Sequence, residues 1–223
     1  ALEWTIDKTY ILKNDLLIMD ILASNNWERP IYFAVTTGPE AYLGLESHFQ
    51  LEGLAYRLVP LNGKQGNQRV ATDIMYNNII NKFKWGGLDK NEVYMDENNL
   101  RMAITMRMQM VTLANALNKE GKKDLALKTL DKCIDVLPER NVPFFNEPLD
   151  YTFYLVQTYY EAGATKQPNE IIKRLLQVVS GNMDYYISLK GKERNSWQKE
   201  IDRKISMLNA LMDSAKQHKQ DAT

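Results

Sequence analysis

The chain contains 223 residues, of which 44% are hydrophobic and 25% are charged, as in an ordinary globular protein with a substantial core. Its 28 basic and 28 acidic side chains cancel, which argues against nucleic-acid binding, and no stretch approaches the roughly 20 consecutive apolar residues of a membrane-spanning helix. The length suits two compact lobes, which we place at residues 1–90 and 91–223.

The cysteine and histidine content argues against disulfide and metal frameworks. Cys133 is the only cysteine, and His48 and His218 lie far apart in the sequence. We therefore expect no internal disulfide, no metal site and no cofactor. Because the chain begins Ala-Leu-Glu, without an initiator methionine or a signal segment, we also expect it to be a piece of a longer protein.

The first 90 residues predict a small mixed α/β lobe. Residues 2–6 alternate apolar and polar side chains, which indicates a short strand. Residues 12–23 carry apolar side chains at helical spacing and predict a well-buried helix. Residues 31–36 and 54–60 predict two strands, and the residues between them are enough for a helical crossover, so we expect a βαβ unit with parallel strands.

The corner between the first helix and the next strand is the segment NNWERPIYFAVT. Its two asparagines suit a helix exit because asparagine tolerates left-handed backbone angles, and Pro30 biases Arg29 toward extended geometry. We expect Trp27 to cover this corner, while Arg29 bonds helix-end carbonyls or an acidic neighbour. A ligand-binding role for Arg29 is the alternative.

Beyond the second strand, residues 61–68 form a polar loop without a phosphate-binding pattern, and residues 69–84 predict a helix. The stretch LANALNKEGKKDLALKTLDKCIDVLP then resembles a tetratricopeptide (TPR) repeat, with its turn at Gly121. A shift of 42 residues places Gly121 on Gly163, so LVQTYYEAG predicts the first helix of a second repeat.

Two repeats are too few for a free solenoid, so a capping helix is expected over residues 193–217. The chain is thus predicted to be α+β, with the small mixed α/β lobe followed by TPR-like antiparallel helix pairs and this C-terminal cap. The apolar stripe of the cap comprises Trp197, Ile201, Ile205, Leu208, Met212 and Ala215.

No catalytic motif is present in the sequence. Glu40, Glu46, His48 and Glu52 gather polar groups as an acid-base site would, but no partner motif accompanies them, and a solvated helix face is the alternative. There is no Gly-x-Ser-x-Gly elbow, His-Glu-x-x-His pair or glycine-rich nucleotide fingerprint. We therefore predict no catalytic residues.

Aromatic residues concentrate around the second repeat. Such rings either line a groove for an extended peptide or a sugar face, or fill the interfaces between helices. The binding candidates are Phe144, Phe145, Tyr154, Tyr160 and, in the first lobe, Arg29.

Two segments, LEWTIDKTYILKNDLLIMDILASNNWERPIYFAVT and YLGLESHFQLEGLAYRLVP, together resemble the C-terminal region of a bacterial multi-spanning membrane family. That family has long been labelled a domain of unknown function and is grouped with protein O-mannosyltransferase-like, GT-C-type glycosyltransferases. The resemblance implies that the acidic catalytic residues and the lipid-linked sugar site lie in an N-terminal membrane domain outside this chain, so no catalytic residue is carried over.

The resemblance also implies a non-catalytic, extracytoplasmic domain of a membrane glycosyltransferase, in the periplasm of a Gram-negative bacterium. The expected role is to recruit acceptors, and the expected partners are a protein or peptide, such as an acceptor polypeptide, and the chain's own N-terminal membrane domain. Two alternatives stay open. One is a carbohydrate-binding or hydrolytic domain that uses the His48 region, and the other is a purely structural or oligomerisation module.

Overall fold

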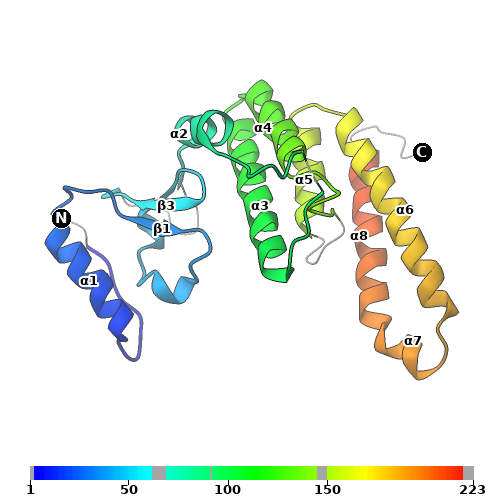
Figure 1. Cartoon of the computed structure of the whole chain (residues 1–223), viewed down its shortest axis with the longest axis horizontal. Coiled ribbons are helices and arrows are strands. Elements are labelled where there is room, and N and C mark those ends of the chain that lie inside the picture. The colour runs from blue at the N-terminus through cyan, green and yellow to red at the C-terminus, as the bar shows by residue number, and fades with distance from the viewer. Residues whose placement is uncertain (1–2, 62–68, 91, 145–149, 218–223) are drawn as a thin grey trace. The chain divides into compact units, whose positions relative to one another are not determined.

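The computed structural model describes residues 3–61, 69–90, 92–144 and 150–217. The chain divides into two compact units, Ala1–Lys84 and Trp85–Thr223. The first combines helices with a small sheet, and the described part of the second is helical (Figure 1), which confirms the predicted α+β class. Among the residues that the structure describes, no helix has both the length and the apolar character needed to cross a bilayer.

The sheet of the first unit is mixed. Its strands are β1 (Tyr32–Ala34), β2 (Phe49–Leu51), β3 (Ala55–Leu58) and β4 (Arg69–Val70), in the order β1-β3-β2-β4. β3 pairs antiparallel with β1 and with β2, while β4 pairs parallel with β2. The prediction of parallel strands over residues 31–36 and 54–60 was therefore wrong.

The segment between β1 and β3 turns back instead of crossing over. Where a helix was expected, the chain makes only two single turns, η1 (Pro39–Ala41) and η2 (Glu46–His48), before it enters β2. Leu43 and Gly44 both have positive φ, which interrupts a right-handed helix, and Gly53 at φ 151° allows the tight return into β3. An antiparallel arrangement follows from these turns.

The predicted helix over residues 12–23 forms as α1 (Lys13–Asn25), but it is not well buried. Asp15 is its buried residue, and the Asp15 carboxylate accepts hydrogen bonds from Lys8 Nζ at 2.8 Å and from the Leu12 backbone N–H at 3.0 Å. These two bonds lower the pKa of Asp15. The large apolar side chains on and just before α1 that are exposed are Tyr10, Ile11, Leu12, Leu16, Leu17 and Ile21.

Two further predictions for the first unit need correction. Residues 3–6 run as irregular backbone, so the described part of the expected strand at 2–6 does not form, because five alternating residues are too few to specify a pairing partner. The helix expected at residues 69–84 begins later, since residues 69–70 join the sheet as β4. It consists of α2 (Thr72–Asn77) and the π-helical turn η3 (Asn78–Lys82).

Helices of the second unit form two pairs that close in the same way. The first pair is α3 (Glu97–Lys119) with α4 (Lys123–Val136), and the second is α5 (Asp150–Glu161) with α6 (Lys166–Ser188). Gly121 N donates to Asn118 O at 3.0 Å, and Gly163 N donates to Tyr160 O at 2.8 Å, both glycines having positive φ. The short turns fold each pair back on itself, and Figure 1 shows α3 and α4 side by side. The two turns therefore repeat the geometry that the 42-residue shift predicts.

The linker between the two pairs is held by a buried arginine that sequence reasoning missed. Arg107 of α3 is 3% exposed, and its Nη2 donates to Leu137 O at 2.8 Å and to Val142 O at 2.6 Å. Its guanidinium also lies over the Phe144 ring, 4.9 Å from the centroid. Burial lowers the pKa of Arg107. Arg107 therefore holds the start of the linker, although its neighbours on the buried face of α3, such as Ala103 and Met110, are apolar.

The C-terminal cap is broken into α7 (Lys192–Ser196) and α8 (Gln198–Gln217), and α8 packs against α6 and α5. The buried face of the cap differs from the predicted stripe. Three residues of the predicted stripe, Trp197, Ile205 and Met212, are exposed. Lys204 is buried instead, since its Nζ binds Tyr186 Oη at 2.9 Å and Glu200 Oε1 at 3.0 Å. The residues on the buried stripe are Ile201, Lys204, Met207, Leu211, Ser214 and Ala215.

Candidate binding pocket

The corner that joins α1 to β1 holds two consecutive residues in the left-handed region. Asn26 has φ 46° and Trp27 has φ 61°. The left-handed asparagine agrees with the sequence prediction, but a left-handed tryptophan is unusual because its Cβ crowds the following carbonyl, at a cost of roughly 1–2 kcal/mol. The Asn25 amide nitrogen donates to Arg29 O at 2.8 Å and Glu28 N donates to Asn25 O at 2.9 Å, so the surrounding turn holds this strained backbone in place.

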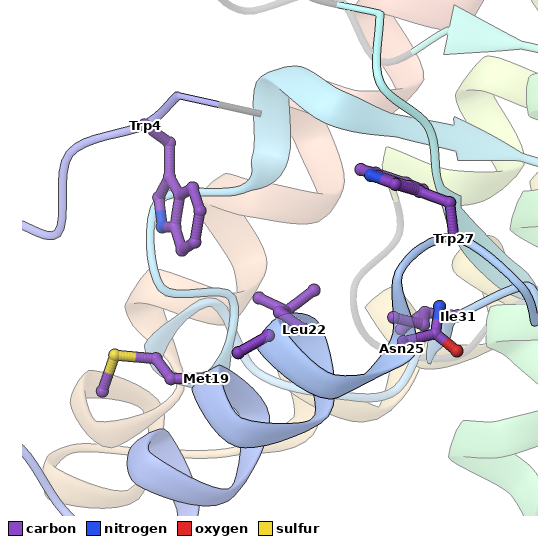
Figure 2. Close-up of a pocket in the computed structure, with 7 residues that line it drawn as sticks. Trp4, Met19, Leu22, Asn25, Trp27 and Ile31 are labelled. Carbon is purple, nitrogen blue, oxygen red and sulfur yellow. The ribbon is translucent and has the colours of Figure 1, made fainter. Parts of the chain in front are cut away.

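Trp27 forms one side of an open pocket. The tryptophan was expected to cover the corner, yet 47% of its surface is exposed. Figure 2 shows the indole rings of Trp4 and Trp27 on two sides of the pocket, with Leu22 of α1 between them. The pocket has a volume of about 240 Å³ and is lined by Trp4, Met19, Leu22, Ala23, Asn25, Trp27 and Ile31; we call it the indole pocket.

The position of Trp4 depends on a close contact between two loops. A Cβ added to Gly44 would lie 2.5 Å from Thr5 O and 3.8 Å from Cδ1 of Trp4, so only glycine lets residues 4–5 approach this turn. The Trp4 indole N–H is buried and has no hydrogen-bond acceptor among the described residues. Buried donors of this kind are rare, and they concentrate at strained or functional positions.

The chemistry of the indole pocket favours binding over catalysis. Its lining is apolar except for the Asn25 amide, and it contains no acid, base or nucleophile. Indole faces bind apolar side chains and the apolar faces of sugar rings. The Arg29 side chain is exposed and is not among the lining residues, although Arg29 O helps to close the end of the helix.

The candidate acid-base residues around His48 are not among those that line the indole pocket. His48 and Glu52 are buried, whereas Glu40 and Glu46 are exposed. The Glu52 carboxylate accepts hydrogen bonds from Tyr32 Oη at 2.9 Å and from Gln50 Nε2 at 2.8 Å, which tie it to the sheet. In the described ranges there is also no group of three or more metal-ligating side chains suited to hold an ion.

The aromatic candidates of the second unit are divided among different environments. Tyr160 is 5% exposed and its hydroxyl donates to Asn169 Oδ1 at 2.6 Å, so its ring belongs to the packing of α5 and α6. Tyr154 is exposed, Phe144 is buried under Arg107, and Phe145 lies outside the described residues. The structure therefore does not gather these candidates into one aromatic groove.

Phe144 does line a second cavity, an acidic groove of about 570 Å³ within the second unit. Arg174 Nε binds Glu139 Oε1 at 2.8 Å, and the buried Tyr159 hydroxyl donates to Asp131 Oδ1 at 3.1 Å. Burial raises the pKa of Tyr159, so it stays protonated as a donor. The lining comprises Asp131, Ile134, Asp135, Glu139, Phe144, Tyr159, Gln167, Glu170, Ile171 and Arg174.

The described part of the chain thus has an α+β fold with two cavities, the indole pocket in the first unit and the acidic groove in the second. Residues 1–79 match the family model described as TMEM260-associated domain 2. The match includes every residue that lines the indole pocket and stops before α3. No curated protein and no solved structure matches the chain.

Proposed function

We propose that this chain is a non-catalytic, extracytoplasmic interaction module of a membrane glycosyltransferase, in which the indole pocket binds an extended acceptor polypeptide. The similarity of residues 1–79 to a TMEM260-associated domain and the resemblance to O-mannosyltransferase-like membrane proteins support the glycosyltransferase context. The TPR-like helix pairs of the second unit offer a further surface for protein partners, because stacked helix pairs present extended binding surfaces.

The observation that carries this proposal is the strained, half-exposed Trp27. A tryptophan that serves only the core is buried in an unstrained conformation, whereas Trp27 occupies the left-handed region and still leaves 47% of its surface to solvent. A strained backbone that leaves its side chain exposed is typical of binding sites, where the surrounding fold holds the side chain in the conformation that binds the ligand. Tryptophan is also the side chain most enriched among residues that dominate binding energy.

The lining of the pocket indicates the part of a polypeptide that would enter it. An apolar side chain fits a cavity whose walls are two indoles, Leu22, Met19 and Ile31. A charged side chain would lose its hydration there without gaining an opposite charge. The ligand is therefore an extended polypeptide with an exposed aliphatic or aromatic residue.

The proposal is tested with a set of extended peptides that differ only in the central residue. We use capped peptides of alternating threonine and serine with lysines at both ends, and place leucine, phenylalanine, aspartate or lysine at the central serine position, so that the central residue is the one large apolar side chain. Calorimetry of the full chain should detect binding of the leucine and phenylalanine peptides, and Trp27→Ala should weaken it by roughly tenfold or more.

Trp197→Ala is the matched control, because Trp197 is 43% exposed and lies outside both cavities. It should bind the peptides as the unmodified chain does. Absence of binding for all four peptides, or equal losses in the two variants, would overturn the proposal.

Carbohydrate binding is the second candidate function, and the two indole walls are the observation that favours it. A sugar ring stacks its apolar face on an indole, and the Asn25 amide could bind a hydroxyl. Glycan-array binding that Trp27→Ala removes, together with no response to the peptides, would establish this function instead.

A further inference from the structure

The edge of the sheet beside the indole pocket is open. β1 is the first strand in the order β1-β3-β2-β4, and within the described residues no strand lies on its other side. Edge strands expose unpaired backbone groups, which natural proteins usually protect with charged side chains, proline, bulges or a covering segment. β1 has the sequence Tyr-Phe-Ala and carries no charge.

The hydrogen bonds of β1 show which backbone groups face outward. Ile31 O accepts from Leu58 N at 2.9 Å, and Val35 N donates to Leu54 O at 3.1 Å. Because bonded residues alternate along an antiparallel pair, Ile31, Phe33 and Val35 face β3, and the backbone groups of Tyr32 and Ala34 face the open edge. Ala34 O accepts from Thr37 N at 2.9 Å, so the edge offers the Tyr32 N–H and C=O and the Ala34 N–H.

The open edge and the indole pocket meet at one residue. Ile31 directly precedes β1 and lines the pocket. In a sheet, side chains directly opposite each other on neighbouring strands lie on the same face. A ligand residue opposite Ile31 would therefore share the face of the sheet from which the Ile31 side chain reaches the pocket, while its neighbour opposite Tyr32 would bond to the edge.

We infer that the polypeptide bound by the indole pocket is captured as an added strand on β1, with backbone bonds to Tyr32 and Ala34 and one apolar side chain in the pocket. This inference rests on the proposed function and specifies its geometry. Strand addition draws affinity from main-chain bonds and selectivity from pockets for alternate side chains. β1 spans only three residues, so the few backbone bonds need the pocket to give specific binding.

N-methylated versions of the leucine peptide test the geometry. In an extended strand, the N–H groups of successive residues point to opposite sides, so the leucine in the pocket directs its own N–H away from β1 and its two threonine neighbours direct theirs toward it. Methylation of both threonine nitrogens should weaken binding roughly fivefold or more, since the Tyr32 C=O, which is the acceptor that the edge offers to a ligand N–H, loses a bond of about 1 kcal/mol. Methylation of the leucine nitrogen should leave the affinity unchanged within twofold.

A variant of the protein tests the same backbone bonds by removing a donor from β1 instead of from the peptide. Ala34→Pro removes an N–H that faces away from β3, and proline is tolerated on the open side of an edge strand. We expect this variant to keep its thermal unfolding midpoint near that of the unmodified chain and to bind the leucine peptide roughly fivefold or more weakly, since it loses one bond of about 1 kcal/mol. If the variant does not fold, the pair of methylated peptides decides the question with the unmodified protein.

The outcomes separate this inference from the proposed function. Binding that depends on Trp27 but is affected equally by the two methylation patterns would overturn the added strand and leave the peptide-binding pocket in place. If none of the peptides binds in a Trp27-dependent manner, the proposed function itself is overturned. Hydrogen exchange gives an independent readout, because the added strand should slow exchange of the Tyr32 and Ala34 amides, and unchanged exchange in the presence of saturating peptide would contradict it.

Discussion

At the scale of single residues, Trp27 combines a strained backbone with an exposed indole ring. Its conformation favours glycine over any residue that has a Cβ. The usual preference for alanine over glycine should therefore be reversed at this position, and the reversal can be measured without any ligand.

We predict that Trp27→Gly has a free energy of unfolding about 1 kcal/mol higher than Trp27→Ala, because alanine keeps the left-handed penalty and glycine does not. Urea denaturation of the two variants measures this difference. Trp197→Gly and Trp197→Ala form the control pair, since Trp197 has φ −96° and should show no such preference for glycine. An alanine variant at position 27 that is the more stable of its pair would contradict the left-handed conformation.

Arg107 is the second residue whose role depends on its surroundings. Its guanidinium is buried among the backbone carbonyls of Leu137, Val142 and Pro143. Replacing it with methionine keeps most of the volume but leaves buried carbonyls without their donor, which costs roughly 1–3 kcal/mol for a group of this kind.

We predict that Arg107→Met lowers the free energy of unfolding of the second unit by about 2–4 kcal/mol. Chemical denaturation followed by circular dichroism measures the loss. Arg101→Met on the exposed side of the same helix is the control and should change stability by less than about 0.5 kcal/mol. Equal stabilities of the two variants would show that Arg107 does not hold the linker.

At the scale of elements, some glycines allow a turn and others allow a turn and a close contact. Replacing these two kinds of glycine should cost different amounts of stability. Gly121 has φ 76° but open space around its Cα, so it serves the turn between α3 and α4. Gly44 has φ 78° and also lies against Thr5 O, so it serves both a turn and the contact that positions Trp4.

We predict that Gly121→Ala costs about 1 kcal/mol of stability, from backbone strain alone. Gly44→Ala should cost about 2–4 kcal/mol and should also weaken binding of the leucine peptide, because the contact between residues 4–5 and this turn is lost. Thermal unfolding and calorimetry measure the two effects. The explanation for the Trp4 position is wrong if Gly44→Ala binds the peptide normally.

The elements also show which parts of the fold can be predicted from local sequence patterns. The apolar periodicity and the turn glycines predicted α4 and the ends of α3 and α5 that lead into the two turns, because a helix and its antiparallel return depend on nearby residues. The βαβ prediction failed because the segment 37–53 has helix-compatible composition, while its direction is set at Leu43 and Gly44 by positive φ angles that composition does not reveal.

At the scale of the whole molecule, the two compact units each have their own core. Phe33, Phe49 and Tyr56 form part of an aromatic core in the first, where the rings of Phe49 and Tyr56 stack 5.4 Å apart. The core of the second is formed by its helices, with Leu113 and Leu155 fully buried. A unit with its own core can fold independently of its neighbour.

We predict that residues 85–223, produced alone, fold with a cooperative thermal transition and the helical circular dichroism spectrum of the second unit. Compact units that each have their own core behave as domains. This fragment lacks the indole pocket, so it should not bind the leucine peptide in the Trp27-dependent manner. A non-cooperative transition would show that the second unit requires the first.

The sequence by itself determined the α+β class, the position of α1 and the repeated helix pairs, because these depend on periodicity and turn residues that act over a few positions. Tertiary structure alone decided that β1 and β3 run antiparallel, that Arg107 and Lys204 are buried, and that Trp4 and Trp27 face a shared pocket. Each of these features joins residues that are distant in the sequence, so it depends on packing and backbone angles that no local pattern specifies.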